Sequence, residues 1–414
     1  MTHQEFSQTK ATLPTLNQLH KSVHKALEKQ TPQKTFDVIV LGVGSMGSAT
    51  CFQLAKRGYS VLGLEQFSIS HEYGSHTGQS RLIRKAYFEH SDYVPLLERA
   101  YQNWADLEVL TGQQVYYRTG LLYFAKPDSE LMLGVRESAN RYNLPLETLD
   151  TEGVLAKYPQ FNLPTDFEKL LEPDAGFITP ERAILLYVQE ALRLGATIRA
   201  HEKTLNWVEK DGFITVKTDK GTYSCKKLII TAGAWAGKWM PQLVPKLTVT
   251  RQVLAWVQPK KSKLFALGTM PSWVIADETK ASIFYGMPAL PKGKFGDLTG
   301  IKLGYHYHGE VSNPDAVNRQ TNDAEEQELI QFLQKYMPDG CGKMLALKTC
   351  LYTNTPDEHF ILDVLPDSPN VVIAAGFSGH GFKFASVIGE IMADLAIDGR
   401  TNLPIGFLNM KRLL

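Results

Sequence analysis

The chain has 414 residues, and its 44 lysines and arginines nearly balance its 43 aspartates and glutamates. A nucleic-acid-binding protein normally carries a basic field, so this balance argues against a polyanionic partner. No apolar run approaches the roughly 18 residues of a membrane span, and the N-terminus lacks an apolar core of signal-peptide type. The four cysteines show neither C-x-x-C spacing nor clustered histidines, which disfavours a metal site or a disulfide framework. We therefore expect a reduced, cytoplasmic protein without a nucleic-acid or membrane partner, long enough for two domains.

Residues 1–34 look like an addition in front of the first predicted strand. Apolar side chains recur there near helical spacing among lysines, at Leu13, Leu16, Leu19, Val23 and Leu27. This pattern predicts an amphipathic helix over 16–28 that docks on the body of the protein or frays. An organelle transit peptide is the alternative, because acidic residues are few, although arginine is absent.

A strand, a glycine turn and a helix follow, as in a dinucleotide-binding unit. Residues 36–41 (FDVIVL) form an apolar run typical of a buried strand, and residues 48–56 keep a helical pattern. Between them, Gly42 suits the tight turn, Gly44 lets a pyrophosphate touch bare backbone, and Gly47 lets the helix lie close to the strand. The phosphates would sit at the helix N-terminus, whose unpaired N–H groups favour anions.

A second strand over 59–64 ends at Glu65, at the distance expected of a carboxylate that binds an adenosine ribose through its hydroxyls. A lone glycine motif is weak evidence. The strand before it, the helix after it and this acid together predict a dinucleotide site. The unit fits NAD and FAD equally.

Arg81 and Arg84 follow in a glycine-rich, polar stretch. Three residues apart, they would face one side of a helical turn. Because a guanidinium pairs with a carboxylate in bidentate fashion, the two arginines suit an anionic substrate beside the nucleotide site. Two solvated surface arginines are the alternative that the spacing leaves open.

The middle of the chain mixes helices with strands. The pattern predicts helices at 93–107 and 182–193, strands at 116–125 and 228–235, a turn at 173–176, and further strands from 197 around turns at 211–212 and 220–221. This order indicates an α/β (α+β) fold, in which a nucleotide domain is assembled from separated segments and a second sheet is inserted.

Two later stretches carry residues of chemical interest. Lys302, Gly304 and His306 alternate along a predicted strand and so point to one face of it, which is either a site or an exposed edge. Residues 371–376 form a buried strand, and the glycine turn at 379–381 opens a helix. This second helix N-terminus suits another anionic group, such as the charge on a reduced flavin.

Five motifs in the same order resemble the family of monomeric sarcosine oxidase and N-methyltryptophan oxidase. They are GVGSMG at 42–47, GSH at 74–76 with RLIR at 81–84, KLGYH at 302–306, CLYTNTPDEHF at 350–360 and GFSGHGFKF at 376–384. Their co-occurrence makes chance negligible. The likeness covers about residues 36–410 and does not extend to residues 1–34.

The resemblance implies a Rossmann-like FAD-binding domain of the D-amino-acid-oxidase type with an inserted antiparallel-sheet substrate domain. The implied FAD-binding domain comprises residues 36–117, 178–242 and 355–414, and the implied substrate domain comprises residues 118–177 and 243–354. The resemblance also implies a monomer.

In that family FAD is joined through its 8α-methyl group to a cysteine sulfur, and Cys350 holds the matching position. Such a link needs a thiolate, whereas a lone buried cysteine is usually inert. The residues implied to contact FAD are Gly42, Gly44, Ser45, Met46, Gly47, Glu65, Ser75, His76, Arg81, Trp235, Cys350, Gly379, Gly381, Phe382 and Lys383.

The implied catalytic residues are Arg81, Tyr285, Lys302 and His306, and the implied substrate-binding residues are Arg84, Lys383 and Tyr352. Arg84 and Lys383 would hold the substrate carboxylate, and Tyr285 and His306 would lie near its amine. Lys302 would promote the reaction of reduced flavin with O2, since a fixed cation stabilises superoxide-like charge. The implied enzyme oxidises N-methyl amino acids such as sarcosine by hydride transfer to flavin N5. Hydrolysis of the imine gives formaldehyde and the amino acid, and O2 becomes H2O2.

Two departures from the family pattern bear on the substrate. Val274 lies near a position where the small-substrate members carry methionine, and residues 288–300 read as a longer loop at the pocket. Both could admit something larger than sarcosine, such as N-methyltryptophan or a pipecolate-like imino acid. A tRNA-modifying or non-catalytic flavoprotein is the alternative from another class, because fold alone does not fix function.

Overall fold

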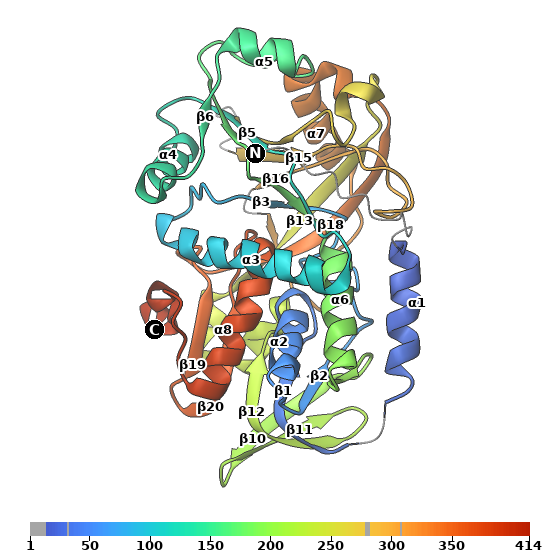
Figure 1. Ribbon diagram of the computed structural model, residues 1–414, viewed down its shortest axis with the longest axis vertical. Coiled ribbons are helices and arrows are strands. Elements are labelled where there is room, and N and C mark those ends of the chain that lie inside the picture. Colours follow the sequence, from blue (N-terminus) through green and yellow to red (C-terminus); the bar gives the residue numbers. More distant parts are fainter. Residues whose placement is uncertain (1–13, 31–32, 278–281, 307–308) are drawn as a thin grey trace.

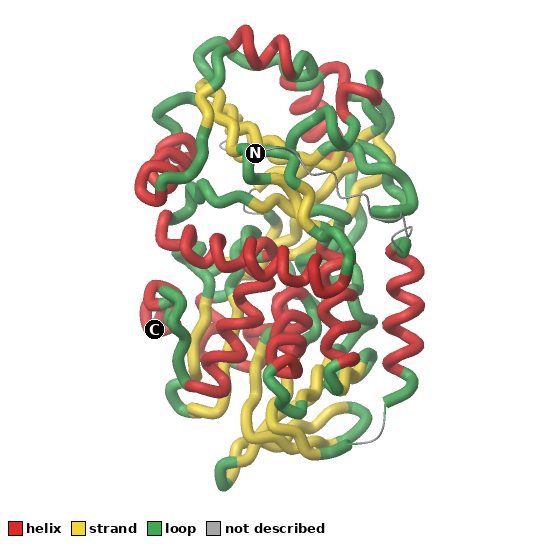
Figure 2. Tube along the Cα trace, viewed as in Figure 1, coloured by secondary structure: helices red, strands yellow, loops and turns green. Residues whose placement is uncertain are grey.

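The computed structural model describes residues 14–30, 33–277, 282–306 and 309–414. The molecule is elongated, with one large sheet in the lower half and another in the upper half of Figure 1. Figure 2 shows helices gathered across the middle, with strands above and below them.

The lower sheet has a parallel core joined to a meander. Its strands are β1 (Thr35–Leu41), β2 (Val61–Leu64), β9 (Thr197–Arg199), β10 (Thr204–Lys210), β11 (Phe213–Thr218), β12 (Thr222–Ile230), β19 (Ile361–Leu365) and β20 (Ser368–Ala375). The order is β10-β11-β12-β1-β2-β9, with β20 beside β12 and β19 beside β20. β1 pairs in parallel with β12 and β2, and β2 pairs in parallel with β9. This pairing confirms the Rossmann-like prediction.

Helices bury the apolar face of this sheet. They are α2 (Ser45–Lys56), α3 (Val94–Thr111), α6 (Pro180–Arg193) and α8 (Ala385–Asp398). α2 packs against both α6 and α8. A Cβ on Gly389 of α8 would stand 2.6 Å from the Ala49 carbonyl carbon, so the α2–α8 contact requires glycine there. The close contact fixes the N-terminus of α2 against the strand ends.

The upper sheet is largely antiparallel. Its strands are β5 (Leu121–Ala125), β6 (Glu147–Thr148), β7 (Glu168–Glu172), β13 (Thr248–Val257), β14 (Ser272–Asp277), β15 (Ser282–Met287), β16 (Ile301–His306), β17 (Glu310–Val311) and β18 (Met344–Asn354). The order is β17-β13-β16-β15-β14-β5-β7-β6, with β18 beside β13. Helices α4 (Glu130–Tyr142), α5 (Thr151–Lys157) and α7 (Asp323–Tyr336) complete this half. Phe332 of α7 stacks on Phe284 with ring centroids 4.0 Å apart, which anchors the helix on the sheet.

A small third sheet corrects one prediction. It consists of β3 (Arg81–Ile83), β8 (Gly176–Ile178) and β4 (Tyr116–Tyr117), in the order β3-β8-β4. Arg81 therefore begins a strand, and the predicted helical turn from Arg81 to Arg84 is wrong. Leu82 pairs with Phe177 across almost a hundred positions of sequence, and such long-range pairing overrides local spacing.

Three strand predictions also need adjustment. The strand predicted at 59–64 begins at Val61, and the one predicted at 116–125 is split by Gly120, whose φ is +72°. The strand predicted at 228–235 ends at Ile230, so that Trp235 lies in the short 3-10 helix Gly233–Trp239. The domain boundaries stay a prediction.

The predicted N-terminal helix is present as α1 (Leu16–Leu27), and it docks rather than frays. Thr15 and Gln18 form a capping box, and α1 packs against α6. Leu19 and Val23 are buried. Residues 1–13 and 31–32 of the predicted extension, Leu13 included, lie outside the described residues. None of the helices in the described part of the chain is long and apolar enough to cross a membrane.

Candidate functional site

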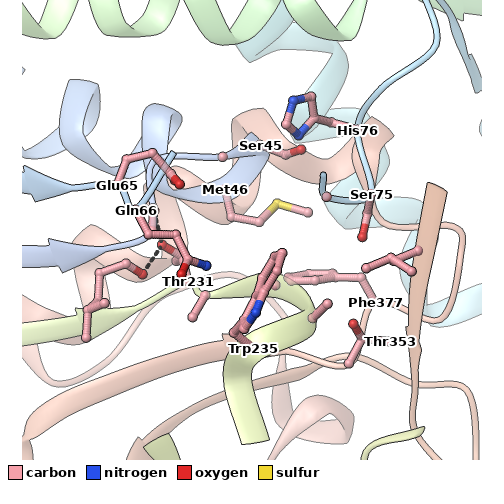
Figure 3. A pocket seen from close by; sticks show the side chains of 18 of the residues that line it. Ser45, Met46, Glu65, Gln66, Ser75, His76, Thr231, Trp235, Thr353 and Phe377 are labelled. Carbon is pink, nitrogen blue, oxygen red and sulfur yellow. Dashed lines mark hydrogen bonds between the residues drawn. The ribbon is translucent and has the colours of Figure 1, made fainter. Parts of the chain in front are cut away.

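A cavity of about 170 Å³ lies where β1, β2 and β12 end, beside the N-terminus of α2. Figure 3 shows its wall, with Glu65 and Gln66 on one side, Ser75 and His76 on the other, and Met46 and Trp235 between them. Dinucleotides bind at this place in open α/β sheets, outside the carboxyl ends of the strands. All the residues predicted to contact the cofactor line this cavity except Gly47, Cys350 and Lys383.

The three glycines of the first turn each have a distinct geometry. Gly42 has φ +93°, and a Cβ there would stand 2.6 Å from the Thr231 carbonyl oxygen. A Cβ on Gly47 would stand 1.8 Å from the Gly42 carbonyl oxygen, so Gly47 lets α2 approach the turn. Gly44 is the N-cap of α2, without a side-chain cap, and a Cβ there would meet nothing within 4 Å. Bare backbone and free N–H groups thus face the cavity, as a phosphate requires.

Glu65 is held in place at the end of β2. Its carboxylate accepts hydrogen bonds from the backbone N–H groups of Val43 and Phe67, each at 3.0 Å. His71 Nε2 lies 3.5 Å from the same carboxylate. Each carboxylate oxygen keeps a lone pair that could accept a ribose hydroxyl.

Three polar atoms in the cavity wall lack partners among the described residues. They are His76 Nε2, Thr204 Oγ1 and Thr353 Oγ1, and all three are buried. Burial, with smaller effects of His71 and Arg81, lowers the His76 pKa to about 3, so the imidazole is neutral. Because buried polar groups are normally hydrogen-bonded, these atoms fit a polar ligand such as a dinucleotide.

Arg81, which lines this cavity, meets the buried side chain of Lys302, which does not line it. Lys302 Nζ and Arg81 Nη1 both donate to the Ser80 carbonyl oxygen. Arg81 also donates to the carbonyl oxygens of Ser75 and Thr77. Burial and Arg81 together lower the Lys302 pKa, against the opposing effects of Glu181 and Cys350. Two positive groups on one carbonyl oxygen form a site suited to an anion.

A second cavity, of about 70 Å³, adjoins the first. It is lined by Arg81, Leu82, Arg84, Phe88, Glu89, Val274, Ile283, Tyr285, His306, Tyr352, Gly379, His380, Phe382 and Lys383. Arg81, Tyr352, Gly379 and Phe382 line both cavities, so the two meet at these residues. Every residue predicted to bind substrate lies here, and of the predicted catalytic residues only Lys302 does not line it.

Arg84 is paired with a carboxylate that the sequence analysis did not single out. Its Nη2 lies 2.6 Å from each carboxylate oxygen of Glu89, and its guanidinium lies over the rings of Tyr87 and Phe88. Burial opposes both charges. The pairing nevertheless raises the Arg84 pKa and, with His380 and Lys383, lowers that of Glu89 to about 2. A substrate carboxylate must therefore compete with Glu89 for Arg84.

Lys383 loses its positive charge more readily than Arg84 does. Its Nζ donates to the His380 carbonyl oxygen at 2.7 Å and lies 3.5 Å from the Tyr87 hydroxyl. Burial, and then Arg84, lower its pKa to about 7, while Glu89 opposes them. Lys383 therefore loses its proton near neutral pH in the ligand-free protein.

His380 and Tyr87 form a buried hydrogen-bonded pair next to Arg84 and Lys383. His380 Nε2 lies 3.0 Å from the Glu358 carbonyl oxygen, so it carries the proton and Nδ1 accepts from the Tyr87 hydroxyl. Burial chiefly lowers the His380 pKa to about 3. His380 stands inside the second glycine motif, which could have marked it, whereas Glu89 and Tyr87 carry no sequence signal.

Tyr285, Tyr352 and His306 line the second cavity from the upper sheet, on β15, β18 and β16 respectively. The two tyrosine hydroxyls hydrogen-bond to each other, and burial raises the pKa of both. The His306 and Tyr352 rings lie 5.6 Å apart. Lys302 is buried and His306 lines the second cavity, so the strand face that they share is not an exposed edge.

The two substrate-related departures have different outcomes. Val274 lines the second cavity. None of residues 288–300 is among the described residues that line it, but Leu298 packs in one apolar cluster with Tyr285 and Tyr352 of the cavity wall. The influence of this loop on the substrate stays a prediction. Phe295 packs against Tyr117 and Phe177, in a cluster that also contains Leu82 and Tyr285 of the cavity wall.

Cys350 lies on β18 between the two cavities but lines neither. It packs with Leu254, Trp256 and Tyr352. Burial raises the pKa of its thiol, while Arg81 and Lys302 act in the opposite direction. Among the described residues, no group of three or more histidine, cysteine or acidic side chains could hold a metal ion.

Residues 37–395 match the model of the family described as FAD dependent oxidoreductase. The chain belongs to this family, and its cofactor is FAD. The open choice between NAD and FAD is thereby resolved, and the prediction of the fold type is confirmed.

Two curated relatives span almost the whole chain. Monomeric sarcosine oxidase of Streptomyces avermitilis is 38% identical over 92% of this chain and 98% of its own length. N-methyl-L-tryptophan oxidase of Escherichia coli is 34% identical over 91% of this chain and 99% of its own length. The solved structure of NikD, an unusual amino acid oxidase essential for nikkomycin biosynthesis, has a TM-score of 0.80 at 25% identity and covers 91% of this chain and 98% of its own. These relatives confirm the family resemblance and the enzyme class: the protein is an oxidoreductase.

The open space at Gly44 yields a direct test of the cofactor cavity. In Gly44→Ala the new methyl group would protrude where phosphate oxygens meet the backbone, so the bound flavin per protein should fall at least several-fold. Flavin content is measured as the ratio of flavin absorbance to protein absorbance, and folding is checked by circular dichroism. Gly406→Ala is the matched control, since a Cβ there also meets nothing within 4 Å. Full flavin content in Gly44→Ala would contradict the phosphate placement.

Proposed function

We propose that the protein oxidises secondary amino acids, with N-methyl amino acids such as sarcosine as the first class. The observation that carries this proposal is the junction of the two cavities, where the cavity beside the N-terminus of α2 meets a smaller one that contains Arg84 and Lys383. When bound, FAD would accept two electrons from the substrate and pass them to O2, which becomes H2O2. The names of the sarcosine and N-methyltryptophan oxidase relatives support the same class.

Arg84 and Lys383 would hold the substrate carboxylate. A charge-assisted hydrogen bond contributes about 1.5–3 kcal/mol, which corresponds to roughly tenfold or more in affinity. Part of this is lost at Arg84, because the substrate displaces Glu89 from the guanidinium. Anchoring the carboxylate orients the rest of the substrate toward the residues shared with the cofactor cavity, which turns an encounter into a positioned reaction.

Tyr285, Tyr352 and His306 would surround the substrate amine. The raised pKa of each tyrosine keeps its hydroxyl protonated, so both serve as hydrogen-bonding groups rather than bases. Oxidation requires a free nitrogen lone pair, and the substrate therefore reacts as the neutral amine. His306, which lines the same cavity, would take the amine proton.

The apolar wall of the second cavity bears on the size of the substrate. It includes Leu82, Phe88, Val274 and Ile283. Such a wall favours an apolar substituent, so N-methyltryptophan or a pipecolate-like imino acid is the alternative substrate. The positive groups beside the Ser80 carbonyl oxygen and beside Glu89 weigh against a non-oxidase role. They would stabilise the charge that develops on oxygen and the charge of an anionic substrate.

We also propose that FAD is linked through its 8α-methyl group to Cys350. The nearby charges of Arg81 and Lys302 favour the thiolate that such a link requires, against the effect of burial. Lys302 would then stand beside the flavin and promote its reaction with O2. We propose further that the enzyme acts as a monomer in the cytoplasm, as the first relative's name and the sequence suggest.

A panel of amines tests the reaction itself. We expect peroxide and formaldehyde from sarcosine or another N-methyl amino acid, and peroxide without formaldehyde from a cyclic imino acid. Coupled peroxide and formaldehyde assays distinguish these outcomes, and Arg84→Met should lose at least roughly tenfold in kcat/KM. Absence of peroxide with every secondary amino acid would overturn the proposed function.

The covalent link has a separate test. Wild-type protein precipitated with acid should keep its yellow colour in the pellet, whereas Cys350→Ser should release its flavin or contain none. Cys341→Ser, which removes another buried thiol, is the control and should keep the colour. Release of flavin from the wild-type protein would show that the link is absent.

The lowered pKa of Lys383 predicts the pH dependence of carboxylate binding. Lys383 is a cation below about pH 7 and neutral above it, so the affinity for propionate should fall as the pH rises through that value. Flavin absorbance titration at a series of pH values gives the dissociation constant. Lys383→Met should bind propionate weakly with no such step, and a flat profile in the wild-type enzyme would refute the assignment.

A further inference from the structure

Glu181 lies outside both the proposed substrate site and the predicted set of residues. It is the second residue of α6, the helix that packs beside α1 and α2 (Figure 1). Its Oε1 accepts hydrogen bonds from the backbone N–H groups of Gly78 at 2.7 Å and Gln79 at 3.1 Å. A carboxylate in the first turn of a helix commonly serves its own helix end, but this one is bound to another segment.

The segment that Glu181 holds has an unfavourable backbone conformation. Gly78 has φ +117° and Gln79 has φ +65°. Glutamine seldom adopts positive φ, and such a residue persists only when its surroundings hold it there. The two charge-assisted hydrogen bonds that the Gly78 and Gln79 N–H groups donate to Glu181 hold the segment in this conformation.

The same turn supports the side chains of both Arg81 and Lys302. Ser80, the next residue, offers the carbonyl oxygen to which Lys302 and Arg81 donate. A Cβ on Gly78 would stand 3.3 Å from Lys302 Nζ and 3.2 Å from Arg81 Nη1, so the turn is also in contact with the two side chains. A displacement of the turn would therefore displace both cations.

Glu181 also balances the charge of this cluster. The charged and titratable groups that act on Lys302 are Arg81, Glu181 and Cys350, and Glu181 is the carboxylate among them. Arg81 disfavours the ammonium form of Lys302, whereas Glu181 favours it. His20 of α1 lies on the other side of Glu181 and interacts with it electrostatically.

We propose that Glu181 is a positioning residue for the oxygen reaction, because it fixes the 78–80 turn and thereby sets the place and charge of Lys302. The inference rests on the proposed role of Lys302. In that half-reaction the reduced enzyme gives two electrons and two protons to O2, and H2O2 forms. Negative charge develops on oxygen, so the rate depends on a cation fixed in place beforehand.

The first test measures the turn itself and not activity. Hydrogen–deuterium exchange of the holoenzyme should show the Gly78 and Gln79 amides exchanging at least tenfold faster in Glu181→Ala than in the wild type. Glu190→Gln is the matched control, because Glu190 lies on the same helix and pairs with Arg193. In Glu190→Gln, the Gly78 and Gln79 amides should exchange at the wild-type rate. If these amides also exchange at the wild-type rate in Glu181→Ala, the proposal is overturned.

The second test separates the two half-reactions by stopped flow. Glu181→Ala should slow reoxidation by O2 at least tenfold and change anaerobic reduction by the amine less than threefold. Glu181→Gln keeps an oxygen acceptor but loses the charge, so the pH above which reoxidation slows should move lower. Equal losses in the two half-reactions would refute the positioning role. If Glu181→Ala does not fold, an unchanged pH profile in Glu181→Gln refutes it instead.

Lys302→Met distinguishes failure of this inference from failure of the proposed function. Normal reoxidation in Lys302→Met would remove the oxygen role from Lys302, and the inference would fall with it. Slow reoxidation in Lys302→Met together with normal reoxidation in both Glu181 variants would leave the role of Lys302 intact and overturn only the role of Glu181.

Discussion

The site depends on the burial of positive charge where the two halves of the molecule meet. Arg84, Lys302 and Lys383 are each at most 5% exposed. Isolated charges are costly to remove from water. The protein offsets this cost with backbone carbonyls and two carboxylates, Glu89 and Glu181, and the remaining positive field is available for anions that bind.

This arrangement divides the site into two electrostatic regions. In the substrate cavity, Arg84 is matched by Glu89 and Lys383 sits close to its titration point, so the cavity can receive a carboxylate without holding a surplus of charge. Beside the cofactor cavity, Lys302 and Arg81 share one carbonyl oxygen, and Glu181 acts on them through the turn and through its charge. The first region suits reversible binding, and the second suits charge that develops during reaction.

The fold brings these regions together through segments distant in sequence. β3 carries Arg81 into a small sheet with β8, which leads directly into α6 and Glu181. β16 brings Lys302 from the upper sheet, and the turn before α8 brings Lys383 from the lower half. The segment just before α1 is bound to the start of α6. Arg182, the residue after Glu181, donates to the carbonyl oxygens of Pro14 and Lys294.

The sequence by itself determined the parts whose signal is local. The roles of Gly42 and Gly47, the amphipathic α1, and the common face of Lys302 and His306 all follow from spacing and backbone geometry. Tertiary structure alone decided that Arg81 begins a strand, that Arg84 pairs with Glu89, that His380 bonds to Tyr87, and that Phe295 packs against Tyr117 and Phe177. The physical reason is that periodicity specifies which face of an element is buried, whereas the partner of a buried charge is chosen by sheet pairing and packing between remote segments.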